Sequence, residues 1–141
     1  MSKGFGCWRN GYIGVNGVAL SDHAREITLD MSVAELADEA HGDKVQLKIT
    51  GLEDWTITAT FLQDFAATKV DATLFPLYGC SSGSFQIEVG ADATTAVSAT
   101  NPRYSGQAIL TSYKVLGGTH GQNLEASATF RPASQLTRRT S

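Results

Sequence analysis

Two neighbouring segments alternate strictly between apolar and polar residues, and this alternation limits them to β-strands. In residues 44–50 the apolar positions are Val45, Leu47 and Ile49. In residues 55–61 they are Trp55, Ile57, Ala59 and Phe61, separated by three threonines. A period of two places one set of side chains on a core face and the other on a polar face. Because residues 51–54 are too few for a crossover, the pattern predicts an antiparallel hairpin with its turn there.

The same reading of the whole chain predicts a mostly β protein. Alternating or apolar runs indicate further strands at residues 12–18, 26–33, 85–89, 107–116 and 124–130. One helix is expected within residues 66–78, because Val70, Leu74, Leu77 and Tyr78 recur at helical spacing. Pro76 ends or bends this helix, and Gly79 stops it. The predicted fold is two packed antiparallel sheets, sandwich-like or barrel-like, with one flanking α-helix.

Length and composition predict a single domain. The chain of 141 residues is 42% hydrophobic and 18% charged, and a chain of this length buries a sufficient core without staples. Residues 1–11 are expected to form a flexible arm, and residues 133–141 a polar, basic tail. No apolar run approaches the ~20 residues of a membrane helix, and no signal peptide is visible. We therefore expect no membrane partner and a cytoplasmic fold with free thiols at Cys7 and Cys80.

Charge is distributed unevenly along the chain. Residues 20–71 contain 11 acidic and 4 basic residues, a net charge of −7, whereas the remainder carries 3 acidic and 7 basic residues, a net charge of +4. The overall charge of −3 argues against a grip on nucleic acid through phosphate neutralisation. Attraction between acidic and basic parts of different copies is one interpretation. Chance clustering of surface charge is the other.

The acidic segment at residues 32–43 is the hardest to assign. Its Ala, Glu and Leu residues favour a short helix by propensity. It also lies between two strands of similar pattern, and a connection this long exceeds the roughly 2–5 residues of usual hairpin loops. We expect it to form an extended loop or hairpin arm that contacts a neighbouring subunit.

The sequence shows no recognisable catalytic chemistry. His23, His41 and His120 are far apart, without the spacing of metal ligands. Ser21, Asp22 and His23 are adjacent, and neighbours in sequence rarely have triad geometry, so a capped turn explains them better. Neither a phosphate loop nor a dinucleotide fingerprint is present. We therefore predict no enzyme, no cofactor, and no catalytic or metal-binding residue.

Several segments together resemble the tail tube, or major tail, proteins of long-tailed, non-contractile bacteriophages. These are LSDHAREITL at residues 20–29, the acidic stretch ending DEAHGD at 38–43, GLEDWTITATFLQDF at 51–65 and VDATLFPLYG at 70–79. The resemblance implies a structural virion protein whose hexameric rings stack into a tube that conducts genomic DNA during ejection. It also implies contacts with other tail proteins, such as the tape measure and terminator. Assembly in the host bacterial cytoplasm and a final location in the virion tail follow from the same resemblance.

The resemblance also assigns roles to residues. Contacts between subunits or rings are expected from Glu35, Leu36, Asp38, Glu39, His41, Asp43, Arg138 and Arg139. A channel lining is expected from Thr28, Asp30, Gln46, Lys48 and Thr50, on the polar faces of the two strands that flank the acidic connection.

Two alternatives to a tube subunit remain. One is a monomeric β-sandwich binding module, which would display clustered exposed aromatic residues. The other is an accessory head–tail or terminator protein, whose rings would close without stacking.

Overall fold

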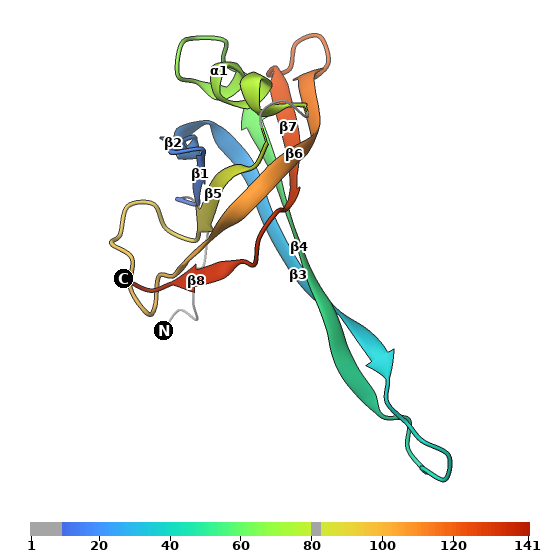
Figure 1. Cartoon of the computed structure of the whole chain (residues 1–141). Helices are drawn as coiled ribbons and strands as arrows, with labels where there is room; N and C mark the ends of the chain where they lie inside the picture. The colour runs from blue at the N-terminus through green and yellow to red at the C-terminus, as the bar shows by residue number, and fades with distance from the viewer. Residues whose placement is uncertain (1–9, 80–82) are drawn as a thin grey trace.

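The computed structural model describes residues 10–79 and 83–141, which fold mainly as antiparallel β-strands (Figure 1). The strands are β1 (Tyr12–Val15), β2 (Val18–Ala19), β3 (Ala24–Ala37), β4 (Lys48–Leu62), β5 (Phe85–Gly90), β6 (Arg103–Gly117), β7 (Glu125–Pro132) and β8 (Thr137–Arg139). The helical elements are η1 (Ser21–His23), α1 (Val70–Leu74) and η2 (Phe75–Leu77). The predicted fold class, mostly β with one short α-helix, is confirmed.

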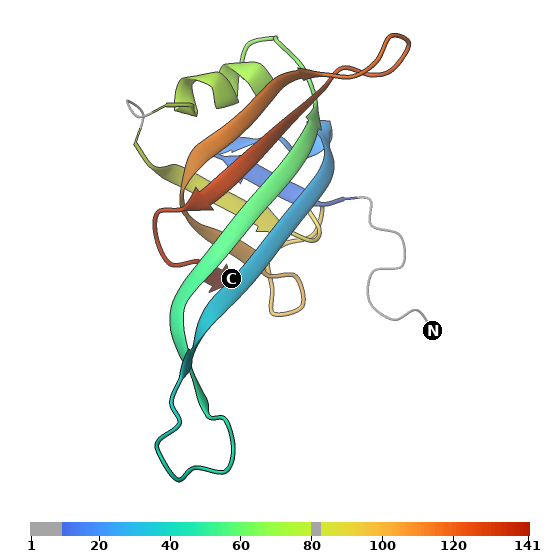
Figure 2. The same cartoon turned by 90° about the vertical axis from the view of Figure 1, so that its right-hand side faces the viewer.

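The strands form one continuous sheet in the order β2-β1-β5-β6-β7-β4-β3, with β8 beside β6. A single curled sheet thus takes the place of the two packed sheets that were predicted, and its two ends face a common core (Figure 2). Phe85 on β5 and Phe130 on β7 meet edge to face across the core, with ring centroids 5.9 Å apart. Long β6 makes the curl possible, because it pairs with β5 over its first half and with β7 over its second.

The predicted turn at residues 51–54 is wrong. Residues 48–62 form the single strand β4, and residues 51–54 lie inside it beside β3. Glu53 pairs with Val33, and Asp54 pairs with Ser32. The polar run reads as a turn because this part of the hairpin projects beyond the core, where no apolar side chain is needed. Val45, Leu47 and Ile49 were predicted to face the core, but they lie in the same projecting part of the hairpin and are exposed.

Residues 32–53 form a long arm that extends away from the rest of the molecule (Figures 1 and 2). The expected hairpin arm is therefore present, with β3 continuing to Ala37 and the connection shortened to residues 38–47. The helical alternative for this acidic segment is wrong, because the cross-strand ladder from Glu35 to Ala37 satisfies the backbone groups.

The helix α1 is shorter than the range of residues 66–78 in which it was predicted. Thr68 has a φ of 63° and Lys69 is extended, so α1 begins only at Val70. Val70, Leu74 and Leu77 are buried as expected, whereas Tyr78 is exposed. Tyr113 on β6 donates a hydrogen bond of 2.9 Å to Asp71. Burial raises the pKa of Tyr113 to about 12, so the donor proton is retained at neutral pH.

The C-terminal residues belong to the sheet. β8 pairs with the start of β6, from Arg103 to Ser105. The Trp55 indole donates a 3.0 Å hydrogen bond to the Ser134 carbonyl, which holds residues 133–136 against the core. The expected N-terminal arm falls almost entirely on residues 1–9, which lie outside the described residues. Asn10 accepts a backbone hydrogen bond of 2.7 Å from Ala93.

Candidate assembly surfaces

The arm carries an unusual amount of exposed apolar surface. Six of the thirteen exposed large hydrophobic residues among the described residues lie in it, and Leu52 is 88% exposed. The six are Val33, Leu36, Val45, Leu47, Ile49 and Leu52. A cluster of this kind on a projecting element indicates a surface that contacts another molecule.

A β-bulge in the arm changes which side of the hairpin is apolar. Between the pairs Val33–Glu53 and Glu35–Thr50, β4 advances by one residue more than β3, and such an extra residue reverses the alternation on its strand. Gly51 occupies the bulge, and a Cβ there would lie 3.2 Å from the Ala34 Cβ and 3.3 Å from the Leu36 Cγ. Gly51 therefore sits on the same side as Ala34 and Leu36.

The two parts of the β3–β4 hairpin consequently differ. We call the side of the sheet that faces the core the core side, and the opposite side the outer face. Below the bulge, the core side carries Ile27, Leu29, Met31, Val33 and Trp55, and the outer face is polar. Beyond the bulge, the register places apolar residues on the outer face, namely Ala34, Leu36 and Ile49.

The outer face of β3, β4, β7 and β6 forms a continuous surface rich in hydroxyl groups. Cross-strand pairs align Thr28 with Thr58, Thr58 with Thr129, and Thr129 with Ser112. Thr56, Thr60 and Ser127 extend the same surface. Small hydroxyl side chains at these positions suit a solvated face of a sheet.

The charges on this outer face nearly balance. The acidic residues are Glu26, Asp30, Asp54 and Glu125, and the basic residues are Arg25, Lys114 and Arg131. Arg131 Nη2 donates to both carboxylate oxygens of Asp54, with N–O distances of 2.9 and 3.1 Å, and Arg131 Nη1 donates to the Thr56 hydroxyl. Arg25 lies 2.8 Å from Glu125. Paired charges on a solvated surface leave little net field.

The residues expected to line a channel are divided by the bulge. Thr28 and Asp30 lie together on the polar outer face. Lys48 and Thr50 fall on the other side of the hairpin because they follow the reversed alternation, and Gln46 lies in the connection. The structure thus brings two of the five onto one surface.

The residues expected to make subunit contacts fall into two groups. Every one of those in the arm is exposed; they are Glu35, Leu36, Asp38, Glu39, His41 and Asp43. The two in β8 already have partners in their own chain. Arg139 Nη1 lies 2.9 Å from Glu88, and Arg138 donates to the Ala99 carbonyl at 3.5 Å.

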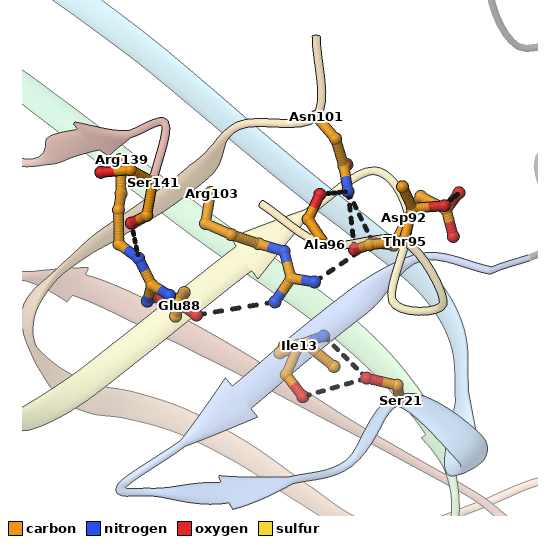
Figure 3. Close-up of polar contacts among 10 residues, drawn as sticks. All are labelled: Ile13, Ser21, Glu88, Asp92, Thr95, Ala96, Asn101, Arg103, Arg139 and Ser141. Carbon is orange, nitrogen blue, oxygen red and sulfur yellow. Dashed lines mark hydrogen bonds and ion pairs between the residues drawn. The ribbon is translucent and has the colours of Figure 1, made fainter. Parts of the chain in front are cut away.

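Glu88 belongs to a polar cluster on the outer side of β1 and β5 (Figure 3). The Arg103 guanidinium lies 3.7 Å from Glu88 and 3.9 Å from the centre of the Tyr12 ring. It also donates to the Asp92 carbonyl at 3.2 Å. Beside it, buried Asn101 donates to three backbone carbonyls of the loop that follows β5, at 3.0–3.2 Å. These contacts fasten β8 and this loop to the sheet.

Sequence reasoning missed part of these surfaces. Leu52 was assigned to a turn, and Ser127 and Thr129 were not connected with the threonines of β4. The signal for the hydroxyl surface was present, since Ser127 and Thr129 alternate with apolar residues as Thr56, Thr58 and Thr60 do. What the sequence does not show is that β4 and β7 are neighbours.

The described residues contain no group of three or more His, Cys, Asp or Glu side chains arranged to hold a metal ion. None of the helices in residues 10–79 and 83–141 is long and apolar enough to cross a membrane.

Comparison with solved structures shows which fold this is. The chain superposes on a chain from an extracellular contractile injection system, in the PVC sheath/tube terminator structure, with a TM-score of 0.70. The match has 10% identity and covers 92% of this chain and 93% of the other. A chain from the virion of a native gene transfer agent matches with a TM-score of 0.69 and 11% identity, covering 92% and 95%.

A third match comes from the tail of an empty gene transfer agent particle with C6 symmetry. Its TM-score is 0.61 at 13% identity, with 82% of this chain and 81% of the other covered. No family model and no curated protein sequence matches the chain. The fold is therefore tail-tube-like, shared with components of phage-like particles. Because the matches include contractile systems, they do not single out the non-contractile tails that the sequence resembles.

Proposed function

We propose that this protein is the structural subunit of a phage or phage-like tail tube, in which hexameric rings stack and enclose a channel for DNA. The observation that supports this most directly is the four-stranded unit β6-β7-β4-β3, with its hydroxyl-rich outer face and two available edges. β3 pairs only with β4, and β6 pairs only with β7 from Thr111 onward, among the strand pairings of the described residues.

The strand directions suit closure into a ring. The three pairings within the unit are all antiparallel, so β6 and β3 at its two edges run in opposite directions. When identical copies repeat around an axis, the β3 edge of one copy meets the β6 edge of the next in an antiparallel pair. Six copies then close a barrel without free edges, and closure removes the aggregation hazard of a long edge strand.

The outer face becomes the channel lining in this arrangement. Thr28, Asp30, Thr56, Thr58 and Thr129 project toward the channel, whereas Lys48 and Thr50 do not. A hydroxyl-lined, nearly neutral wall offers DNA few cationic partners, and phosphate contacts with cations provide most of the affinity for nucleic acid. DNA therefore slides rather than binds. Non-contractile tails, with tape measure and terminator proteins as further partners, are the tail type that the sequence resemblance favours.

A terminator ring is the second candidate, because one of the matched chains comes from a sheath/tube terminator structure. Negative-stain electron microscopy of the purified protein across a range of concentrations tests both candidates. Hollow tubes or stacked rings are the expected result for a tube subunit. Closed rings that never stack would favour the terminator, and uniform small particles at every concentration would contradict self-assembly.

A further inference from the structure

The core side of β3 lines an open apolar groove. One wall consists of Ile27, Leu29 and Met31 on β3, and the other includes Val89, Gly90 and Tyr104 from β5 and β6. The groove has a volume of about 450 Å³. Ile27 and Leu29 are only partly buried against the core, and Met31 is 59% exposed. This end of the core is therefore incompletely covered in a single copy.

The distal arm offers a complementary surface on the opposite side of the same hairpin. Beyond the bulge, Leu36 and Ile49 pair across the two strands on the outer face, beside Ala34. Leu36 and Ile49 are each about half exposed. The other side of the distal arm carries polar residues, namely Glu35, Lys48 and Thr50. Only one side of the distal arm is thus suited to bury apolar area against a partner.

These two apolar surfaces cannot meet within one chain. They lie on opposite faces of the sheet, and Leu29 and Leu36 are separated by seven residues of one strand, roughly 23 Å at 3.3 Å per residue. Two copies in the same orientation, displaced along β3, bring the outer face of one arm onto the core side of the other copy's β3. Such a contact is head to tail and repeats from copy to copy, as a stacked assembly requires.

We propose that the distal arm of one copy packs Leu36 and Ile49 into the groove between β3 and β5–β6 of a second copy. The inference rests on the proposed function, since stacked copies share one orientation, and it names the acceptor site of the arm. The β-bulge at Gly51 makes this contact possible, because it places Ile49 on the same side of the distal arm as Leu36. Without the extra residue in β4, Ile49 would fall on the side of the hairpin that carries the groove while Leu36 on β3 stayed on the outer face, and the distal arm would have no single apolar side.

Charge at the two surfaces is complementary. Arg138 pairs in register with Tyr104, so it lies on the side of the sheet that carries the groove. The connection at the tip of the arm contains Asp38, Glu39 and Asp43 against a single lysine, Lys44. In the proposed contact the acidic tip of one copy meets the side of the next copy's sheet that carries Arg138, and this attraction favours a second copy over a partner of negative charge.

Disulfide trapping between two singly substituted chains tests the contact directly. In a chain with Cys7→Ser and Cys80→Ser, one preparation carries Ile49→Cys in the arm and the other carries Met31→Cys in the groove. The two are mixed at assembling concentration, oxidised, and separated on a non-reducing gel. We expect a crosslinked dimer in the mixture at least tenfold more abundant than in either preparation alone.

The matched control replaces the arm cysteine by Lys48→Cys, on the opposite side of the distal arm, and should give little crosslink with Met31→Cys. Equal crosslinking by both arm positions would overturn the proposed face. No crosslink in the mixture would overturn the docking and assign the groove to another occupant. Electron microscopy of the same samples separates the two proposals, because tubes without the crosslink would refute only the acceptor site. Absence of both would refute the tube subunit as well.

Discussion

His23 lies between two carboxylates, with Nε2 2.9 Å from Asp64 Oδ2 and Nδ1 2.9 Å from Asp22 Oδ1. Asp22 and His23 belong to η1, just before β3, whereas Asp64 follows the end of β4. The imidazole therefore connects the start of one arm strand with the end of the other, at the base of the hairpin. The His23 side chain is 18% exposed, whereas those of Asp22 and Asp64 are 68% and 32% exposed, so solvent screens the contact with Asp22 more than the contact with Asp64.

Protonation of His23 strengthens this connection. The hydrogen bond to Asp22 raises the pKa of His23 above its ordinary value of 6.5. Partial burial opposes this shift of the pKa, and the hydrogen bond to Asp64 adds to it. The hydrogen bond to His23 lowers the pKa of Asp22. The pKa of Asp64 is lowered mainly by the hydrogen bond from the Ala66 backbone N–H, and further by the hydrogen bond to His23. Lys69 is the other charged group that acts on both carboxylates.

The first prediction is a pH dependence of stability. A raised folded-state pKa of a histidine stabilises the protein fully below pH 6.5, and this contribution is lost as pH rises through the folded pKa. The lowered pKa values of Asp22 and Asp64 stabilise above about pH 3.8 and lose their effect as pH falls. We expect the melting temperature, followed by circular dichroism, to fall between pH 6 and pH 8. His23→Gln should flatten this slope, and an unchanged slope would refute the connection.

The second prediction concerns the core. Phe130 is fully buried and packs edge to face on Phe85. Phe130→Ala should lower the free energy of unfolding in urea by about 3–5 kcal/mol, because it removes a large buried ring and leaves a cavity. Phe65→Ala provides the control, since Phe65 is exposed, and should change the free energy by less than about 0.5 kcal/mol. Similar losses for both would show that the core is misplaced.

The core face of β4 and the buried face of α1 were predictable from sequence because both are periodic and both are buried. Trp55, Ile57, Ala59 and Phe61 all became core residues on that basis. In the arm, the same alternation of apolar and polar residues at positions 44–50 does not correspond to burial, because all of these residues are exposed. Apolar residues there are exposed, and a pattern alone does not distinguish a core from a contact with another molecule.

Two further features depended on long-range pairing. The register between β3 and β4 decides that Gly51 forms a bulge rather than a turn, and that register depends on residues eighteen or so positions away in the chain. The pairing of β8 with β6 joins residues more than thirty positions apart, and three polar residues carry no local signal for it. The sequence therefore predicted a contact arm and a polar strand face, but not on which side of the hairpin their residues lie.

The third prediction separates a partly buried ion pair from an exposed one. The Glu88 side chain is 13% exposed and contacts both Arg103, which is 9% exposed, and Arg139, which is 49% exposed. Glu88→Gln leaves the Arg103 charge without its carboxylate and should cost about 3 kcal/mol in urea unfolding. Arg139→Ala breaks only a half-exposed pair and should cost about 0–1 kcal/mol. The reverse order of these two losses would contradict the geometry of Figure 3.

The fourth prediction tests the arm as an assembly element. Replacing residues 34–52 with an Asn-Gly turn between Val33 and Glu53 retains the sheet, because those two residues already pair and Asn-Gly favours a two-residue hairpin turn. The shortened protein should keep its circular dichroism spectrum and melting cooperativity but form no tubes. Since every described residue from Asp30 to Thr50 is exposed, folding does not depend on the arm. Normal tubes would remove the arm from the assembly mechanism.

The fifth prediction concerns the outer face. Asp30 is exposed on this face, and the strand register places it opposite Thr56. Asp30→Lys reverses a charge in every copy of the ring and shifts the nearly neutral face toward positive charge, which attracts phosphate. Tubes should still assemble by electron microscopy, while particles carrying the variant should release DNA more slowly and lose infectivity. Asp30→Asn should give an intermediate loss, since it removes one charge without adding the opposite one. If Asp30→Lys particles release DNA at the normal rate at low salt, where electrostatic attraction is strongest, the outer face of β3 does not line the channel.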